Sequence, residues 1–133
     1  MTYLLDTNVL IAVLNGTSER VVSRIKVHDP SSIQVSAVTR AELLFGARHS
    51  SRPAVNVASA LAVLAPYASL PFDDACADRY GIVRAELAAL GTPIGPNDLF
   101  IAATALAHGL TLVTHNSKEF GRVVGLQMED WHV

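Results

Sequence analysis

The chain has 133 residues, which suits one domain and leaves no room for a second. Half of the residues are hydrophobic and only 17% are charged, a balance that excludes a disordered chain. Ten basic and twelve acidic residues give a net charge of −2, which excludes nucleic-acid binding by bulk positive charge, so any such binding needs a local basic patch.

The first half of the chain alternates between predicted strands and helices. Apolar or β-branched runs predict strands at Tyr3–Leu5 and Ser32–Ser36. Capping residues, prolines and glycines predict four helices: residues 9–14, ended by Asn15-Gly16; Thr17 or Ser18 to Val27; 38–49, capped by Ser36; and 53–65, opened by Pro53 and stopped by Pro66.

The second half continues the alternation. Strands are predicted at residues 70–72 and 110–114, with a polar turn over 115–119 and an edge strand over 123–126. Two helices are predicted: residues 75–90, capped by Asp73 or Asp74 and followed by Gly91, and 97–108, ended by Gly109. We therefore expect an α/β fold in a single domain over residues 1–133, with a parallel sheet covered by helices on both faces.

The same composition bears on location and assembly. One cysteine, Cys76, excludes an internal disulfide and a cysteine-based zinc site, and we expect it in the core. No signal peptide and no stretch long enough to cross a bilayer is visible, so we expect a cytoplasmic protein with no membrane contact. Low charge content and apolar helix faces at 9–14 and 54–64 indicate a homodimer.

Acidic and polar residues occur where strands end or helices begin. Asp6 follows the first strand directly, Glu42 lies early in the helix after the second strand, and Asp98 opens the helix after a Pro/Gly-rich turn. Asn116 and Glu119 follow the strand at 110–114. Because the carboxyl ends of parallel strands meet at one edge of a sheet, we expect these five residues to gather there.

Carboxylates gathered in this way repel one another unless a cation lies between them. Hard oxygen ligands without paired histidines or cysteines favour Mg²⁺, with Mn²⁺ as a substitute. Such an ion activates water and stabilises charge during phosphoryl transfer, so the pattern indicates metal-dependent hydrolysis of a phosphodiester.

Each of these residues also has a structural interpretation. Asp6 is a suitable helix cap, and Asp98 is favoured by the helix dipole in a first turn. Glu42 suits a solvent-exposed helix face. Asn116 and Glu119 suit an ordinary turn. The shared location is the stronger evidence for a site. The five histidines show no ligand spacing and are not predicted to bind metal: His28, His49, His108, His115 and His132.

Four segments together carry a family resemblance. Residues 4–8, 36–47, 96–102 and 112–120 look like the corresponding motifs of PIN-domain proteins, in order and over essentially the whole chain. The small size makes the chain similar to the VapC ribonuclease toxins of bacterial toxin–antitoxin pairs. The resemblance implies a PIN-like three-layer sandwich, with a parallel sheet of four or five strands, and a Mg²⁺- or Mn²⁺-dependent endoribonuclease that acts as a toxin.

The resemblance also implies roles for individual residues and partners. The family's four acidic positions would be Asp6, Glu42, Asp98 and the Asn116/Glu119 turn. The supporting polar groups would be Thr7, Asn8 and Thr114. A VapB-like antitoxin would hold the toxin inactive, and the toxin would be a dimer. Many PIN proteins have an aspartate where this chain has Asn116, so we expect one firmly bound ion.

A further likeness concerns the RNA. Residues 84–96 and 129–131 resemble the subgroup that cuts tRNA in the anticodon region, initiator tRNA included. Contact with RNA also needs cations near the site. The candidates are Arg40, Arg48, Arg84, Lys118 and Arg122.

Three alternative functions have weaker support. An aspartyl phosphatase would need an acid two residues after Asp6, where Asn8 stands. A receiver-like binding module would need a phosphoacceptor aspartate after a middle strand, but the second strand ends in Ser36-Ala37. A PIN-like protein that has lost catalysis and only binds metal or protein would have no reason to keep Asp6, Glu42 and Asp98.

Overall fold

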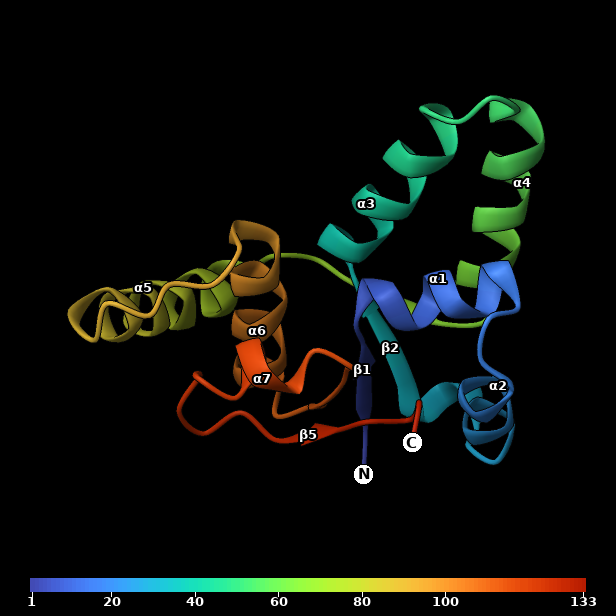
Figure 1. Ribbon diagram of the computed structural model, residues 1–133. Helices are drawn as coiled ribbons and strands as arrows, with labels where there is room; N and C mark the ends of the chain where they lie inside the picture. The colour runs from blue at the N-terminus through green and yellow to red at the C-terminus, as the bar shows by residue number, and fades with distance from the viewer.

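A computed structural model describes residues 1–133 and contains one five-stranded parallel sheet, in the order β3-β2-β1-β4-β5 (Figure 1). The central strand β1 is paired with β2 on one side and with β4 on the other. β3 pairs with β2 and β5 pairs with β4, so these two form the edges. The strands are β1 Tyr3–Leu5, β2 Ile33–Ser36, β3 Ala68–Leu70, β4 Thr111–Val113 and β5 Met128–Glu129.

Helices cover both faces of the sheet and give the expected three layers. Alternate strand residues point to opposite faces. Leu5 and Val113 enter a core with α1 to α4, whereas Leu4 and Leu112 enter a second core with α5, α6 and α7. The helices are α1 Thr7–Asn15, α2 Glu19–Lys26, the 3₁₀ helix η1 Pro30–Ser32, α3 Ala37–Arg48, α4 Pro53–Leu64, α5 Asp74–Ala89, α6 Pro96–His108 and α7 Ser117–Phe120.

Local capping chemistry sets most helix ends, as the sequence predicts. Ser18, Ser36 and Asp73 each accept a hydrogen bond from the backbone amide three residues on. Gly16 and Gly109 end α1 and α6 in the left-handed conformation, both with φ of 63°. α1 begins at Thr7, two residues before the predicted start, because the Asp6 side chain accepts a hydrogen bond from the Thr7 amide.

Two strand predictions are wrong. The strand predicted at 70–72 is β3 at Ala68–Leu70, because Pro71 lacks the N–H that would continue the ladder. The edge strand predicted at 123–126 is instead β5 at 128–129. The segment before β5 is folded into turns, and Gly125 has φ of 81°. The predicted turn at 115–119 contains the short helix α7.

The two helix faces expected at a dimer interface differ in exposure. Within residues 9–14 of α1, Val9 and Leu10 are buried in the core of the same chain, and only Ile11 is exposed. α4 leaves Val55 and Leu61 half or nearly half exposed. The apolar face that stays free is therefore on α4 and not on α1. None of the helices has both the length and the hydropathy required to cross a membrane.

Candidate active site

Asp6 lies at the carboxyl end of the central strand, where its neighbours hold it on both sides. Its backbone amide donates to the Val113 carbonyl at the end of β4 (2.9 Å). Its Oδ2 accepts from Thr114 Oγ1 (2.8 Å) and its Oδ1 accepts from the Thr7 amide (2.8 Å). Burial raises the pKa of Asp6, although both hydrogen bonds lower it, and the charges of Glu42 and Glu119 raise it further.

Glu42 reaches this edge from α3, which begins directly after β2. Glu42 is six residues after the Ser36 cap, so it lies in the second turn of the helix. Its Oε1 accepts from Thr7 Oγ1 (2.7 Å) and its Oε2 accepts from Asn97 Nδ2 (3.2 Å). The Glu42 carboxylate is therefore held between the first turns of α1 and α6.

Asp98 lies in the first turn of α6, after the loop that contains Gly95. Partial burial raises the pKa of Asp98 to about 6, and the negative charges of Asp6, Glu119 and Glu42 raise it in the same direction. The structure gives the Asp98 side chain no hydrogen-bond donor. The Asp98 carboxylate is thus close to three other negative charges and accepts no hydrogen bond.

Glu119 completes the cluster from α7. Its Oε1 accepts from the Gly95 amide (2.7 Å) and its Oε2 accepts from Asn116 Nδ2 (3.0 Å), and these bonds lower its pKa. A Cβ placed on Gly95 would lie 3.7 Å from both Asp98 Oδ2 and Glu119 Oε1. The Gly95 segment therefore runs beside both carboxylates. We call Asp6, Glu42, Asp98 and Glu119 the acidic quartet.

The structure brings together most of the predicted site residues, and it adds two groups that sequence reasoning missed. Thr7 and Thr114 support the quartet directly, whereas Asn8 is exposed and makes no side-chain hydrogen bond. The missed groups are the Asn97 amide on Glu42 and the Gly95 N–H on Glu119. The only signal in the sequence is that Asn97 and Gly95 lie within three residues of Asp98.

The predicted RNA-binding cations come from α3, α5, α7 and the segment after α7. Arg122 is close enough to lower the pKa of Glu119, and its Nη1 donates to the Pro93 carbonyl (3.0 Å). Lys118 is exposed on α7 beside Glu119, and Arg40 is half-buried on α3. Arg84 is exposed on α5. Arg48 ends α3 at its far end, away from the sheet edge (Figure 1).

The donor set of the quartet fits a divalent cation that prefers oxygen ligands. Asp6, Glu42 and Asp98 offer carboxylate oxygens from three different elements, with no nitrogen or sulfur donor among them. The raised pKa values of Asp6 and Asp98 reflect burial together with negative charge that no neighbouring cation compensates. A bound cation would supply that compensation.

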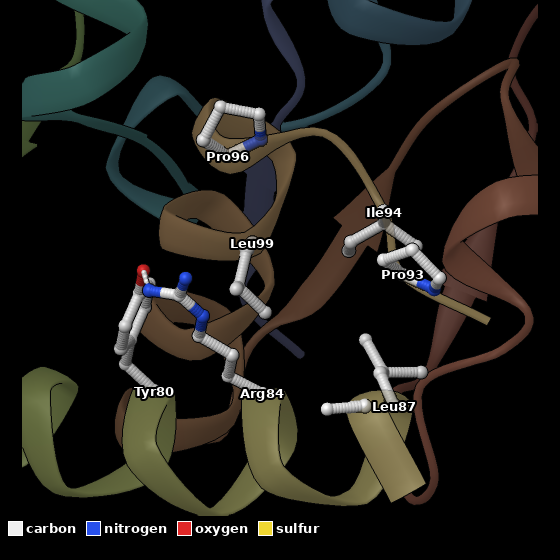
Figure 2. A pocket seen from close by; sticks show the side chains of 8 residues that line it. Tyr80, Arg84, Leu87, Pro93, Ile94, Pro96 and Leu99 are labelled. Atoms are coloured by element: carbon white, nitrogen blue, oxygen red, sulfur yellow. Dashed lines mark hydrogen bonds between the residues drawn. The ribbon is translucent and has the colours of Figure 1, made fainter. Parts of the chain in front are cut away.

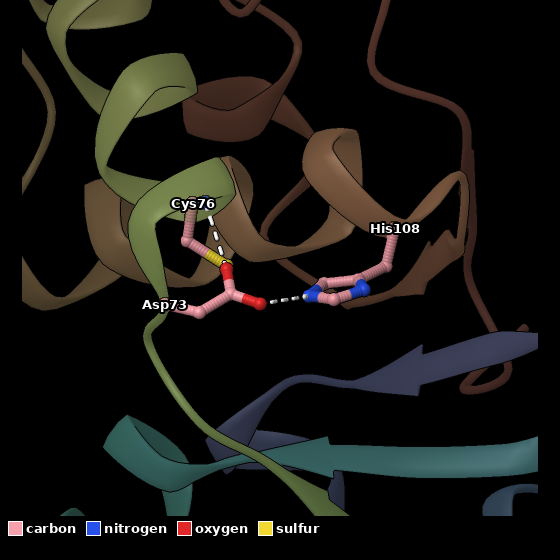
Figure 3. Close-up of side chains that lie close together, drawn as sticks. All are labelled: Asp73, Cys76 and His108. Atoms are coloured by element: carbon pink, nitrogen blue, oxygen red, sulfur yellow. Dashed lines mark hydrogen bonds and ion pairs between the residues drawn. The ribbon is translucent and has the colours of Figure 1, made fainter.

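Two groups of possible metal ligands have their ligand atoms within 4.8 Å of one another, and both lie outside the quartet, in which no three carboxylates are that close. In the first, Asp73 Oδ1 caps α5 while its Oδ2 lies 3.6 Å from His108 Nε2, and Cys76 lies beside them (Figure 3). Cys76 is buried as predicted, and burial raises the pKa of its thiol. A helix cap and an ion pair therefore explain why these three side chains lie together.

The second group brings together two histidines, His115 and His132, whose spacing in the sequence gave no sign of a cluster. Asp130 lies 2.8 Å from His115 Nδ1 and accepts from the His132 amide (2.9 Å). The two imidazole rings are stacked with centroids 4.4 Å apart. This arrangement fastens the C-terminal residues to the end of β4, and its nitrogen donors do not match the oxygen preference of Mg²⁺.

The pKa of Asp98 predicts a specific pH dependence of stability in metal-free protein. Its folded-state pKa of about 6 lies above the ordinary value of 3.8, so this carboxyl stabilises the fold below the ordinary value, and that contribution is lost as the pH rises through 6. Asp98→Asn mimics the protonated form. In EDTA, we expect the variant to melt above the wild type near pH 7 and the difference to shrink as the pH falls to about 5. A difference that does not change with pH would contradict this account.

Comparisons with known proteins agree with this geometry. Residues 3–126 match the PIN domain family. The chain is 37% identical over 131 residues to the tRNA(fMet)-specific endonuclease VapC of Salmonella typhimurium, and 38% identical to the protein of the same name from Shigella flexneri, covering 98% of each chain. It superposes with a TM-score of 0.94 and 36% identity on a chain of the DNA-bound VapBC crystal structure from Salmonella typhimurium, covering 98% of both.

Proposed function

We propose that this chain, which belongs to the PIN domain family and within it to the VapC ribonucleases, is a divalent-metal-dependent endoribonuclease. The proposed active site is the acidic quartet. The observation that carries the proposal is that Asp6 after β1, Glu42 on α3, Asp98 on α6 and Glu119 on α7 lie at one sheet edge. Burial there, together with the charges of the other three carboxylates, raises the pKa of Asp98 to about 6. Residues 1–133 act as one domain in this proposal.

The proposed cofactor is Mg²⁺, with Mn²⁺ as a substitute, held by Asp6, Asp98 and Glu42. A bound Mg²⁺ supplies water activation and charge neutralisation for phosphodiester hydrolysis. Asn116 is neutral and its amide donates to Glu119, so this side of the quartet offers less charge. We therefore propose one firmly bound ion.

The remaining residues of the site hold the carboxylates in place. Thr114 and the Thr7 amide fix Asp6, and Thr7 Oγ1 fixes Glu42, so the first turn of α1 aligns two carboxylates at once. Asn97 holds the second oxygen of Glu42. Rigid support of this kind keeps charged ligands at fixed positions, which is what electrostatic catalysis requires.

The proposed substrate is tRNA, and within it the anticodon region of initiator tRNA, in line with the names of the Salmonella and Shigella relatives. The proposed RNA contacts come from Arg84, Lys118 and Arg122, and from Arg40, two residues before Glu42 on α3. Cleavage of initiator tRNA would inhibit translation in the cytoplasm. The proposed inhibitor is a VapB-like antitoxin, because the structural relative is a VapBC complex.

Purified protein free of any partner tests the enzymatic proposal. It is incubated with bulk tRNA in Mg²⁺ or in EDTA, and the new 5′ ends are mapped. Discrete cuts that require Mg²⁺ support a ribonuclease. RNA that stays intact in Mg²⁺ and in Mn²⁺, with a normally folded protein, would favour the alternative of a binding module without catalysis.

The proposed toxin is a homodimer. Besides the face on α4, Phe45 on α3 is 69% exposed and lines a shallow depression with Val38 and Phe100, next to Glu42 and Asn97 of the site. Apolar surface of this kind is typical of subunit interfaces. We expect light scattering at micromolar concentration to give twice the chain mass of 14.2 kDa. A mass of one chain, both alone and after co-expression with the antitoxin, would contradict the dimer.

A further inference from the structure

An open pocket of about 430 Å³ lies between α5, the loop before α6 and the first turn of α6 (Figure 2). Leu87, Ile94 and Leu99 form its apolar wall, together with the rings of Pro93 and Pro96. Tyr80 and Arg84 stand on the α5 side of the opening. The pocket is outside the acidic quartet, and none of the contacts described above occupies it.

Arg84 is the only charged side chain that lines this pocket. Its Nη1 donates to the Tyr80 hydroxyl (3.0 Å), and its guanidinium carbon lies 5.8 Å from the centre of the Tyr80 ring. The side chain is exposed and forms no ion pair with a carboxylate. Its positive charge and the flat face of the guanidinium are thus held by the tyrosine and available to a ligand.

The pocket and the acidic quartet share one wall. Pro93, Ile94 and Pro96 line the pocket, while Gly95 between them donates to Glu119 on the other side. Arg122 holds the same segment through the Pro93 carbonyl. Asp98 immediately precedes Leu99, which lines the pocket. A single peptide segment therefore separates the two sites, so an RNA strand with a phosphate at the quartet would pass beside the pocket.

We propose that this pocket binds one unstacked nucleobase of the RNA, next to the phosphate that is held at the acidic quartet. The proposal rests on the proposed function of the quartet. A base is a flat, largely apolar ring, and proteins recognise unstacked bases in single-stranded RNA by apolar contact and by stacking on aromatic rings or on arginine. Arg84 on one side and Arg122 on the other flank the shared wall with positive charge, which suits a polyanion better than a neutral protein segment.

Binding without cleavage provides the main test. Short single-stranded RNAs, each with 2-aminopurine at one position, are titrated with the protein in EDTA. We expect 2-aminopurine fluorescence to change at one position. Ala88 on α5 also lines the pocket. Ala88→Trp fills the pocket and should weaken binding by about tenfold or more, the effect of losing one stacked base. Arg84→Ala should weaken binding. It should also reduce the slope of log affinity against log salt concentration by about one, the effect of losing one phosphate contact.

Two controls match these substitutions. Ala75→Trp places the same side chain on an exposed position in the first turn of α5, outside the pocket lining, and Arg52→Ala removes an exposed arginine before α4. Both should bind RNA as the wild type does. The proposal is overturned if Ala88→Trp binds RNA with wild-type affinity, or if no 2-aminopurine position responds to the wild type. It is also overturned if Ala88→Trp weakens only the homodimer or the antitoxin complex, because the pocket is then a protein contact.

Cleavage separates this proposal from the proposed function. If the wild type cuts RNA, Ala88→Trp should lose the preference for a particular base beside the cut, and an unchanged preference would overturn the pocket alone. If the wild type cuts no RNA in Mg²⁺ or Mn²⁺, the proposed function fails, and the binding experiment in EDTA still decides whether the pocket takes a base.

Discussion

Asp98→Asn is expected to lower metal-dependent RNA cleavage by about 10²- to 10⁴-fold while the protein stays folded. The substitution keeps the size of the side chain but removes the charge that would hold the ion. Asp98 has no hydrogen-bond donor to lose, and its pKa of about 6 shows that its charge is unfavourable in the metal-free fold. The expected loss is therefore one of activity and not of stability.

The measurement is the cleavage rate of the variant at saturating Mg²⁺, with a thermal melt of the same preparation. Asp74→Asn is the matched control, since Asp74 is an exposed aspartate in the first turn of α5. It should keep the wild-type rate. Asn116→Ala should have a milder effect than Asp98→Asn, because a neutral amide contributes less to holding a divalent ion. Wild-type cleavage by a folded Asp98→Asn protein would mean that Asp98 only opposes the dipole of α6.

Trp131→Ala is expected to lower the free energy of unfolding by about 3–5 kcal/mol. Trp131 is completely buried although it is two residues from the end of the chain. Its ring stacks on His28 and lies edge-on to Tyr3, with centroids 4.8 and 5.1 Å away, and its indole N–H donates to Glu129 (3.0 Å). The substitution would leave a cavity beneath β1 and release the C-terminal residues.

Urea denaturation measures this loss. Trp131→Phe keeps part of the ring contact and should lose less, and Val133→Ala should be neutral because Val133 is exposed. A change below about 1 kcal/mol for Trp131→Ala would contradict a structural role for the C-terminal segment.

The elements that the sequence predicts correctly are those fixed by local chemistry. A serine or aspartate cap, a proline in the first turn or a glycine after the last turn determines a helix end within a few residues, as at Ser36 and Gly109. The two strands that the sequence misplaces, β3 and β5, are the edge strands of the sheet. Their positions depend on pairing with β2 and β4, which no local pattern encodes.

The same distinction applies to the site. Asp6, Glu42, Asp98 and Glu119 could be predicted because each follows a strand end or opens a helix, and parallel topology brings such positions together. The Asn97 and Gly95 donors depend on how α6 packs against α3 and α7, and so does the shared wall of the pocket. The His115–His132 contact depends on the turn that returns the chain beside β4.

The most direct test of the account is the position of Mn²⁺ in crystals of the partner-free protein, located by anomalous diffraction. We predict one strong peak among the carboxylates of Asp6, Asp98 and Glu42, and its loss in Asp98→Asn crystals. A peak at Asp73 and His108, or at His115 and His132, with none in the acidic quartet would contradict the account.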